Sequence, residues 1–148
     1  LTPEKPSHIL TNSKGTYYVN YAGKIMSRTT EVQQNDIKSI PTINDETGSE
    51  TSTGTYVLSE SATKFLTILH KQISAEGLNV QSIILPKAAA NEVDVRLEGK
   101  HYYIKFQIGS DPRQAVGSYL AASKRIESEN INISEYIDVR VEEKVFFK

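Results

Sequence analysis

The chain has 148 residues, of which 38% are hydrophobic and 24% charged, and its formal net charge is -1. This length and composition predict one globular domain, and the near-zero charge gives no electrostatic basis for binding nucleic acid or an anionic membrane. The absence of cysteine excludes disulfide bonds and thiolate metal sites.

The first predicted elements form a β-hairpin. Tyr17, Val19 and Tyr21 alternate with polar neighbours, and Gly23 suits the tight turn into residues 24–26. Residues 27–54 are rich in Thr, Ser, Asn, Asp and Glu and have no sustained period. We therefore expect a long polar connection, held in place by the apolar segment at residues 40–43.

Residues 59–76 predict an amphipathic helix, because apolar side chains recur at spacings of three and four and Gly77 follows as a C-cap. Residues 80–85 are rich in β-branched side chains and predict a strand. A hairpin follows, with apolar alternation over residues 93–97 and 102–108 around a turn at Gly99.

A second helix is predicted from its first residues. Asp111 is a good N-cap, Pro112 suits the first helical position, and Gln114 is placed to complete a capping box. The expected buried stripe of this helix consists of Val116, Tyr119, Leu120 and Ile126.

The chain closes with a strand at residues 136–141, a turn at Glu142 and Glu143, and the apolar segment 144–148. Ile137, Val139 and Val141 alternate with polar residues, which is typical of a half-buried strand. The adjacent Phe146 and Phe147 must point to opposite faces of any strand. Two interpretations stay open here: an open docking edge, or an inner strand with both rings buried.

The order of elements predicts an α/β (α+β) fold, in which two packed helices cover a mixed, largely antiparallel, curved sheet. His8, His70 and His101 lie far apart in the sequence and are expected to be packing or surface residues rather than metal ligands. The tyrosines are expected to pack on strands or to supply contact surface; they include Tyr17, Tyr18, Tyr21, Tyr102, Tyr103, Tyr119 and Tyr136.

The main enzymatic alternative is a metal-dependent nuclease, for which Glu92 and Asp94 on one strand and Lys105 on the next supply part of the required set. The residue two before Lys105 is Tyr103, so the second metal-binding carboxylate is missing from its expected position. No nucleophilic serine turn is present. We therefore predict no catalytic residue, metal or cofactor.

Several segments, taken in order, resemble the β domain of the FtsQ/DivIB family of bacterial cell-division proteins. They are residues 4–6, Tyr-Tyr-Val-Asn-Tyr-Ala-Gly at 17–23, Ile-Pro-Thr-Ile at 40–43, Ile-Gly at 108–109, Tyr-Ile-Asp-Val-Arg at 136–140 and Lys-Val-Phe-Phe-Lys at 144–148. The resemblance covers nearly the whole chain. Asn20 stands where family members typically carry Asp, and Ile40 where many carry Leu.

The resemblance implies a single-pass protein of the bacterial cytoplasmic membrane at the division septum. Residues 1–10 would be the junction from a missing POTRA domain, and residues 11–148 the extracytoplasmic β domain; the first residue, Leu1, agrees with a piece of a longer protein. The implied role is a non-enzymatic divisome scaffold that binds FtsB/DivIC-like and FtsL-like coiled-coil proteins and helps control septal peptidoglycan synthesis.

The family's partners dock on the last strands of the β domain, and Arg140 would face an acidic residue of the partner. An uncovered strand edge offers unpaired N–H and C=O groups, so the closing segment also suits strand addition on physical grounds. The expected partner-binding residues are Tyr136, Asp138, Arg140, Val141, Lys144, Val145, Phe146 and Phe147. A generic cell-surface protein-binding module remains a further alternative.

Overall fold

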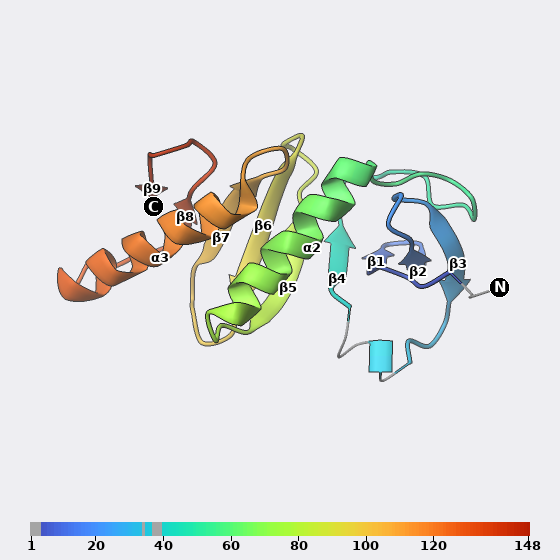
Figure 1. Cartoon of the computed structure of the whole chain (residues 1–148), viewed down its shortest axis with the longest axis horizontal. Helices are drawn as coiled ribbons and strands as arrows, with labels where there is room; N and C mark the ends of the chain where they lie inside the picture. Colours follow the sequence, from blue (N-terminus) through green and yellow to red (C-terminus); the bar gives the residue numbers. More distant parts are fainter. Residues whose placement is uncertain (1–3, 34, 37–39) are drawn as a thin grey trace.

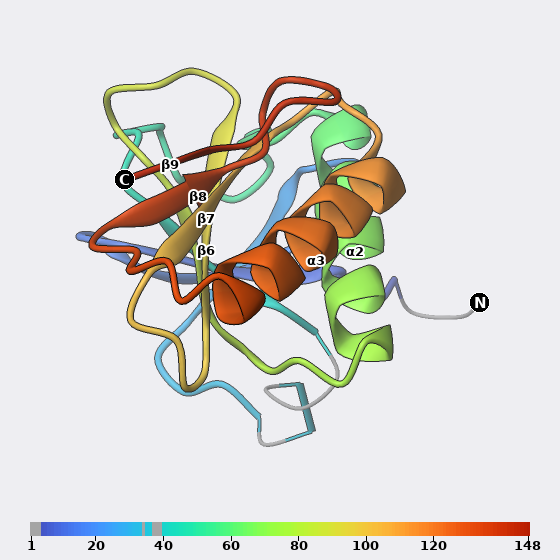
Figure 2. The same cartoon turned by 90° about the vertical axis from the view of Figure 1, so that its left-hand side faces the viewer.

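A computed structural model describes residues 4–33, 35–36 and 40–148, and in them a nine-stranded mixed sheet carries two long helices on one face (Figures 1 and 2). The fold class predicted from the sequence is confirmed. The strands are β1 (His8–Asn12), β2 (Gly15–Val19), β3 (Ile25–Thr29), β4 (Thr42–Asp45), β5 (Val80–Leu85), β6 (Glu92–Leu97), β7 (Tyr103–Gln107), β8 (Tyr136–Asp138) and β9 (Phe146–Phe147). The helices are α2 (Glu60–Ala75) and α3 (Pro112–Ser128).

The strand order is β3-β2-β1-β4-β5-β6-β7-β8-β9. The pairs β4/β5 and β7/β8 are parallel, and a helix makes the crossover in each: α2 joins β4 to β5, and α3 joins β7 to β8. Strand β1 also pairs in parallel with β4, whereas the remaining pairs are antiparallel. Because both crossovers pass over the same face, no helix of the described residues covers the opposite face of β5–β9 (Figure 2).

Both helices begin where the sequence predicts. The Ser59 side chain accepts a hydrogen bond from the Ala62 amide, and Asp111 accepts from the amides of Arg113 and Gln114. The predicted capping box is wrong, because the Gln114 side chain bonds to Glu142 instead of reaching back to its own helix start. That contact ties α3 to the β8–β9 turn.

The predicted long polar connection is wrong in part. β3 continues to Thr29, and residues 42–45 form β4, an inner strand whose Ile43 is fully buried. Residues 34 and 37–39 of that connection lie outside the described part. The sequence also gave no sign of β1, which pairs with both β2 and β4.

The main core lies between the helices and β4–β8. The helix residues Leu66, Leu69 and Ile73 pack there against the inward side chains of the sheet, as predicted. At the other end of this core the buried hydroxyl groups of Tyr102 and Tyr119 are hydrogen-bonded at 2.7 Å, which fixes α3 over β7. A smaller cluster of Leu10, Tyr17, Val19 and Ile25 fills the N-terminal end.

One buried residue on β1 carries an ionisable group. His8 is fully buried, its Nδ1 lies 2.8 Å from the Ser7 hydroxyl, and its Nε2 has no hydrogen-bond partner among the residues that the structure describes. Burial, and secondarily the positive charge of nearby His70, lower the pKa of His8 from 6.5 to about 4. The folded chain therefore holds this imidazole in its neutral form.

This burial predicts an acid-dependent loss of stability. Below pH 6.5 the His8 imidazole is protonated in the unfolded chain, whereas in the folded chain it stays neutral down to about pH 4. The free energy of unfolding should therefore decrease as the pH is lowered through that window, by about 3 kcal/mol at most. In His8→Leu, urea unfolding at a series of pH values should lose this component; an unchanged pH dependence would contradict the assignment.

Candidate docking site at the C-terminal sheet edge

The β8–β9 hairpin forms the last two strands of the sheet, and β9 has no neighbour on its outer side among the described strands. Figure 2 views the molecule from this edge. The predicted turn is present at Glu142 and Glu143, where Glu143 adopts a φ of 61°. Because β9 is the last strand of the sheet and both of its rings are exposed, the interpretation of residues 144–148 as an inner strand with buried rings is wrong.

The register determines which backbone groups of β9 face outward. Tyr136 and Lys148 exchange both backbone hydrogen bonds, at 3.1 and 3.0 Å. Since bonded and non-bonded pairs alternate along an antiparallel ladder, the next pair, Ile137 with Phe147, is a non-bonded pair. The N–H and C=O of Phe147 thus point away from β8, to the open edge, and those of Val145 follow by the same alternation.

The side chains of β9 divide between the two faces of the sheet. Phe147 pairs with the buried Ile137 and lies on the helix side, whereas Phe146 pairs with Asp138 on the other side. Phe146 is 52% exposed and Phe147 is 41% exposed. The prediction that the rings point to opposite faces holds for this register, but neither ring enters the core.

A shallow groove of about 360 Å³ separates β9 from α3. Val145 and Phe147 form its sheet side, Glu143 lies at its turn end, and three of the five helix residues that line it are small. The helix residues that line it are Ser118, Ala121, Ala122, Arg125 and Ile126. This groove was not predicted from the sequence, although the small residues at spacings of three and four on α3 were a usable signal.

Strand β8 is shorter than predicted and ends at Asp138. The Asp138 carboxylate accepts a hydrogen bond from the backbone amide of Arg140, two residues later, and this local bond turns the chain out of the ladder. Val139 still reaches the core, but Val141 is 51% exposed instead of sharing the buried face of Ile137 and Val139.

Arg140 is held by two carboxylates of its own chain. Its Nη1 lies 2.7 Å from Glu92 Oε1, and its Nη2 and Nε lie 2.7 and 3.0 Å from the two Asp138 oxygens. The Arg140 side chain is 33% exposed, and both carboxylates are almost buried. The expected contact with a partner's acidic residue stays a prediction. Glu92, which the sequence suggested only for the nuclease alternative, is absent from the predicted docking site.

The ion pairs shift the ionisation of these groups. Burial works to raise the pKa of Asp138, but the hydrogen bonds and the charge of Arg140 outweigh it, and the pKa lies below its ordinary value. The hydrogen bond with Asp138 in turn raises the pKa of Arg140. Both groups therefore stay charged in the folded chain near neutral pH.

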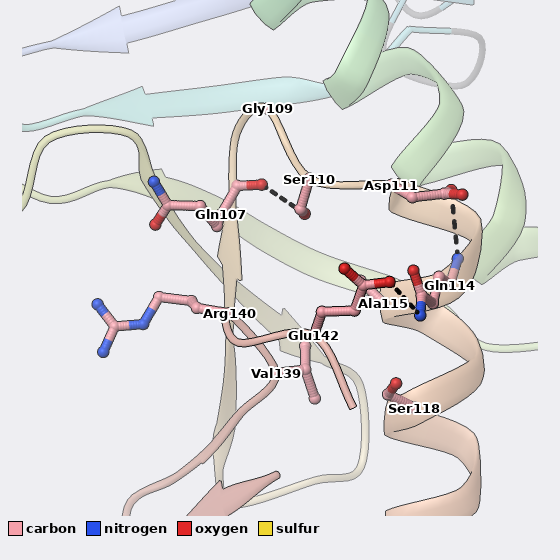
Figure 3. A pocket seen from close by; sticks show the side chains of 10 residues that line it. All are labelled: Gln107, Gly109, Ser110, Asp111, Gln114, Ala115, Ser118, Val139, Arg140 and Glu142. Atoms are coloured by element: carbon pink, nitrogen blue, oxygen red, sulfur yellow. Dashed lines mark hydrogen bonds between the residues drawn. The ribbon is translucent and has the colours of Figure 1, made fainter. Parts of the chain in front are cut away.

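A second hollow, of about 580 Å³, lies between the start of α3 and the β8–β9 turn (Figure 3). The Gln114 side-chain amide donates to the Glu142 carboxylate at 3.1 Å across it. In Figure 3 the Arg140 side chain points to the opposite side of the strands from Glu142. The turn is thus fastened to the helix on one side and to the sheet face, through Arg140, on the other.

The nuclease alternative can be compared with this geometry. Asp94 and Lys105 are cross-strand partners, but Glu92 and Asp138 are engaged by Arg140. Among residues 4–33, 35–36 and 40–148, no three His, Cys, Asp or Glu side chains are grouped to hold a metal ion. The arrangement favours an ion-pair cluster that braces the sheet.

Comparisons with known proteins add no family. No protein-family model matches the chain, and no curated protein matches it. In the described part of the chain, neither helix combines the length and the apolar character that a bilayer crossing requires.

The ion-pair cluster predicts a stability difference between two arginines. Arg140→Met would leave the nearly buried Glu92 and Asp138 unpaired and should lower the free energy of unfolding by about 2 kcal/mol. Arg125→Met is the matched control, because its pair with Glu129 is exposed and should change stability by less than about 0.5 kcal/mol. Urea unfolding at neutral pH tests this, and equal losses in the two variants would refute it.

Proposed function

We propose that this domain is a non-enzymatic docking module of the bacterial divisome, of the FtsQ/DivIB type, which binds FtsB/DivIC-like and FtsL-like proteins at its C-terminal sheet edge. In this role it would sit outside the cytoplasmic membrane at the septum, anchored by a single span of the full-length protein, and would help to control septal peptidoglycan synthesis. The observation that supports this most is the open β9 edge, with its outward backbone groups at Phe147 and its exposed rings.

The edge suits the addition of an extended partner segment. A strand laid beside β9 satisfies the outward N–H and C=O of Phe147, which water now solvates. Partner side chains on the helix side would enter the groove beside Phe147, over the small residues Ala121 and Ala122. Side chains on the other side would lie next to Phe146. Main-chain bonds would then supply affinity, and the groove would supply selectivity.

The charges around the edge favour a different, acidic chain over a second copy. Two copies paired antiparallel through the outward groups of Val145 and Phe147, with Phe146 opposite itself, would place Lys144 against Lys148 twice. Like charges directly opposite each other destabilise a strand pair. A partner with an acidic residue opposite Lys144 gains where a second copy loses, whereas Lys148 already pairs with Glu135 of its own chain at 3.2 Å.

Arg140 retains capacity for a partner carboxylate. A guanidinium has five N–H donors, and three hydrogen bonds from Arg140 go to Glu92 and Asp138. The remaining donors belong to a side chain that is 33% exposed. An acidic partner residue would therefore join an existing cluster and would compete with Glu92 for the guanidinium.

Strand addition predicts a specific effect of proline. Phe147→Pro removes the outward N–H while the ladder bonds of Lys148 with Tyr136 are kept, and proline is tolerated on sheet edges. Phe147→Ala removes the ring but keeps the N–H. Calorimetric titration with the extracytoplasmic segment of the FtsB or DivIC protein of the same organism should show about tenfold weaker binding for the proline variant than for the alanine variant.

Equal affinities of the two variants, with both folded by circular dichroism, would exclude strand addition at β9. Tight binding of an unrelated acidic strand, with none of the FtsB or DivIC segment, would instead favour a generic protein-binding module.

A further inference from the structure

Six charged side chains share the uncovered face of β6–β8. Lys105 on β7 is the cross-strand partner of Asp94 on one side and of Asp138 on the other. Glu92 and Arg140 join the group through the ion pair at 2.7 Å, and the Arg96 guanidinium lies 5.2 Å from the centre of the Tyr103 ring. Three carboxylates and three cations therefore occupy one half-buried patch, and their charges balance only while no further carboxylate joins them.

Asp94 is the carboxylate of this group that has no ion pair in the described part of the chain. Its Oδ1 is buried and makes no hydrogen bond there, and its side chain interacts with the neighbouring Glu92 carboxylate, whereas Glu92 and Asp138 are both bound by Arg140. The Lys105 ammonium lies 4.2 Å from the centre of the Tyr136 ring, so its charge is shared with that ring.

The surroundings of Asp94 supply charges of both signs. On its own strand they are Glu92 and Arg96, on β7 they are Tyr103 and Lys105, and beyond β7 they are Asp138 and Arg140. On the other side, the β5 partner of Asp94 is the uncharged Ile84. Burial and the neighbouring Glu92 carboxylate raise the pKa of Asp94 to about 7, against the opposing effect of Lys105 and Arg140.

We propose that Asp94 is a proton-binding residue coupled to the docking edge, so that engagement of Arg140 by an acidic partner is accompanied by uptake of a proton at the Glu92–Asp94 pair. This inference rests on the proposed function, because it requires an acidic residue of the partner at Arg140. It assigns to Asp94 a regulatory role that is separate from contact with the partner.

The coupling follows from charge balance. A partner carboxylate that shares Arg140 draws the guanidinium from Glu92 and adds a fourth negative charge to the patch. Both changes favour the protonated form of Asp94. The negative charge of the neighbouring Glu92 is then less compensated by Arg140, and a proton on Asp94 relieves the repulsion between the two carboxylates. By linkage, whatever makes proton binding tighter in the complex also makes partner binding tighter at lower pH.

The pH dependence has a definite sign. Below about pH 7 Asp94 already carries the proton, so partner binding costs nothing further at this residue. Above it, each unit of pH should weaken binding by up to about tenfold, because a proton must be taken from solution. The affinity is thus expected to fall as the pH rises from about 6 to about 8.

The inference is tested in two steps on the folded domain. First, carboxyl carbon NMR shifts of the free chain should show Asp94 titrating near 7, not near its ordinary value of 3.8. Second, calorimetric titration with the FtsB or DivIC segment, in phosphate and in Tris at the same pH, should give heats that differ by the uptake of up to one proton.

Asp94→Asn is the decisive variant, because its amide imitates the protonated acid. It should bind as tightly at about pH 8 as the native domain does at about pH 6, with no proton uptake. Glu98→Gln is the control, since Glu98 is exposed at the β6–β7 turn and should leave the uptake unchanged.

The outcomes separate this inference from the proposed function. Titration of Asp94 near 4, or proton uptake that persists in Asp94→Asn, overturns the inference and leaves docking at β9 standing. Failure of the segment to bind the native domain anywhere between about pH 5 and about pH 8 overturns both the docking proposal and the coupling.

Discussion

The ion pairs of Arg140 with Glu92 and Asp138 determine the shape of the C-terminal edge. They connect β6 to the end of β8 across β7, with contacts of 2.7 Å to each carboxylate. The same Asp138 carboxylate binds the Arg140 amide and ends β8, so the chain turns at Glu142 and returns as β9. The cluster thus fixes where the sheet stops, and the edge that we propose for docking depends on it.

This arrangement separates the tasks of the two sheet faces. On the helix side, Phe147 and Val145 border a groove along α3 whose lining includes Arg125 and Glu143 as well as small and apolar side chains. On the other side, the charged patch responds to the charge of whatever binds and to the protons that it holds. Arg140 belongs to the second face but lies at the turn between β8 and β9, and we propose that a partner at the edge contacts both faces.

The sequence predicted the elements whose burial is one-sided. The helices and the β5–β7 strands carry clear apolar periods, and their caps and turns lie where the residue types require. Strand β1 was missed because His8, Ile9 and Leu10 are all buried, as in inner strands covered on both faces, which removes the alternation. At the edge, the turn and the opposed rings could be predicted from the sequence. It could not give the bond of Arg140 to Glu92, because the two residues lie 48 positions apart and meet only when β7 and α3 bring β6 and β8 together.

The central claim is that β9 is an open strand edge that a partner extends, and hydrogen exchange at single amides tests it most directly. In the free domain the Phe147 amide should exchange rapidly while the Lys148 amide, bonded to Tyr136, is protected. With the FtsB or DivIC segment bound, the account predicts new protection at Phe147 and little change at Lys148. Protection of Phe147 in the free domain, or rapid exchange at Phe147 in a saturated complex, would contradict it.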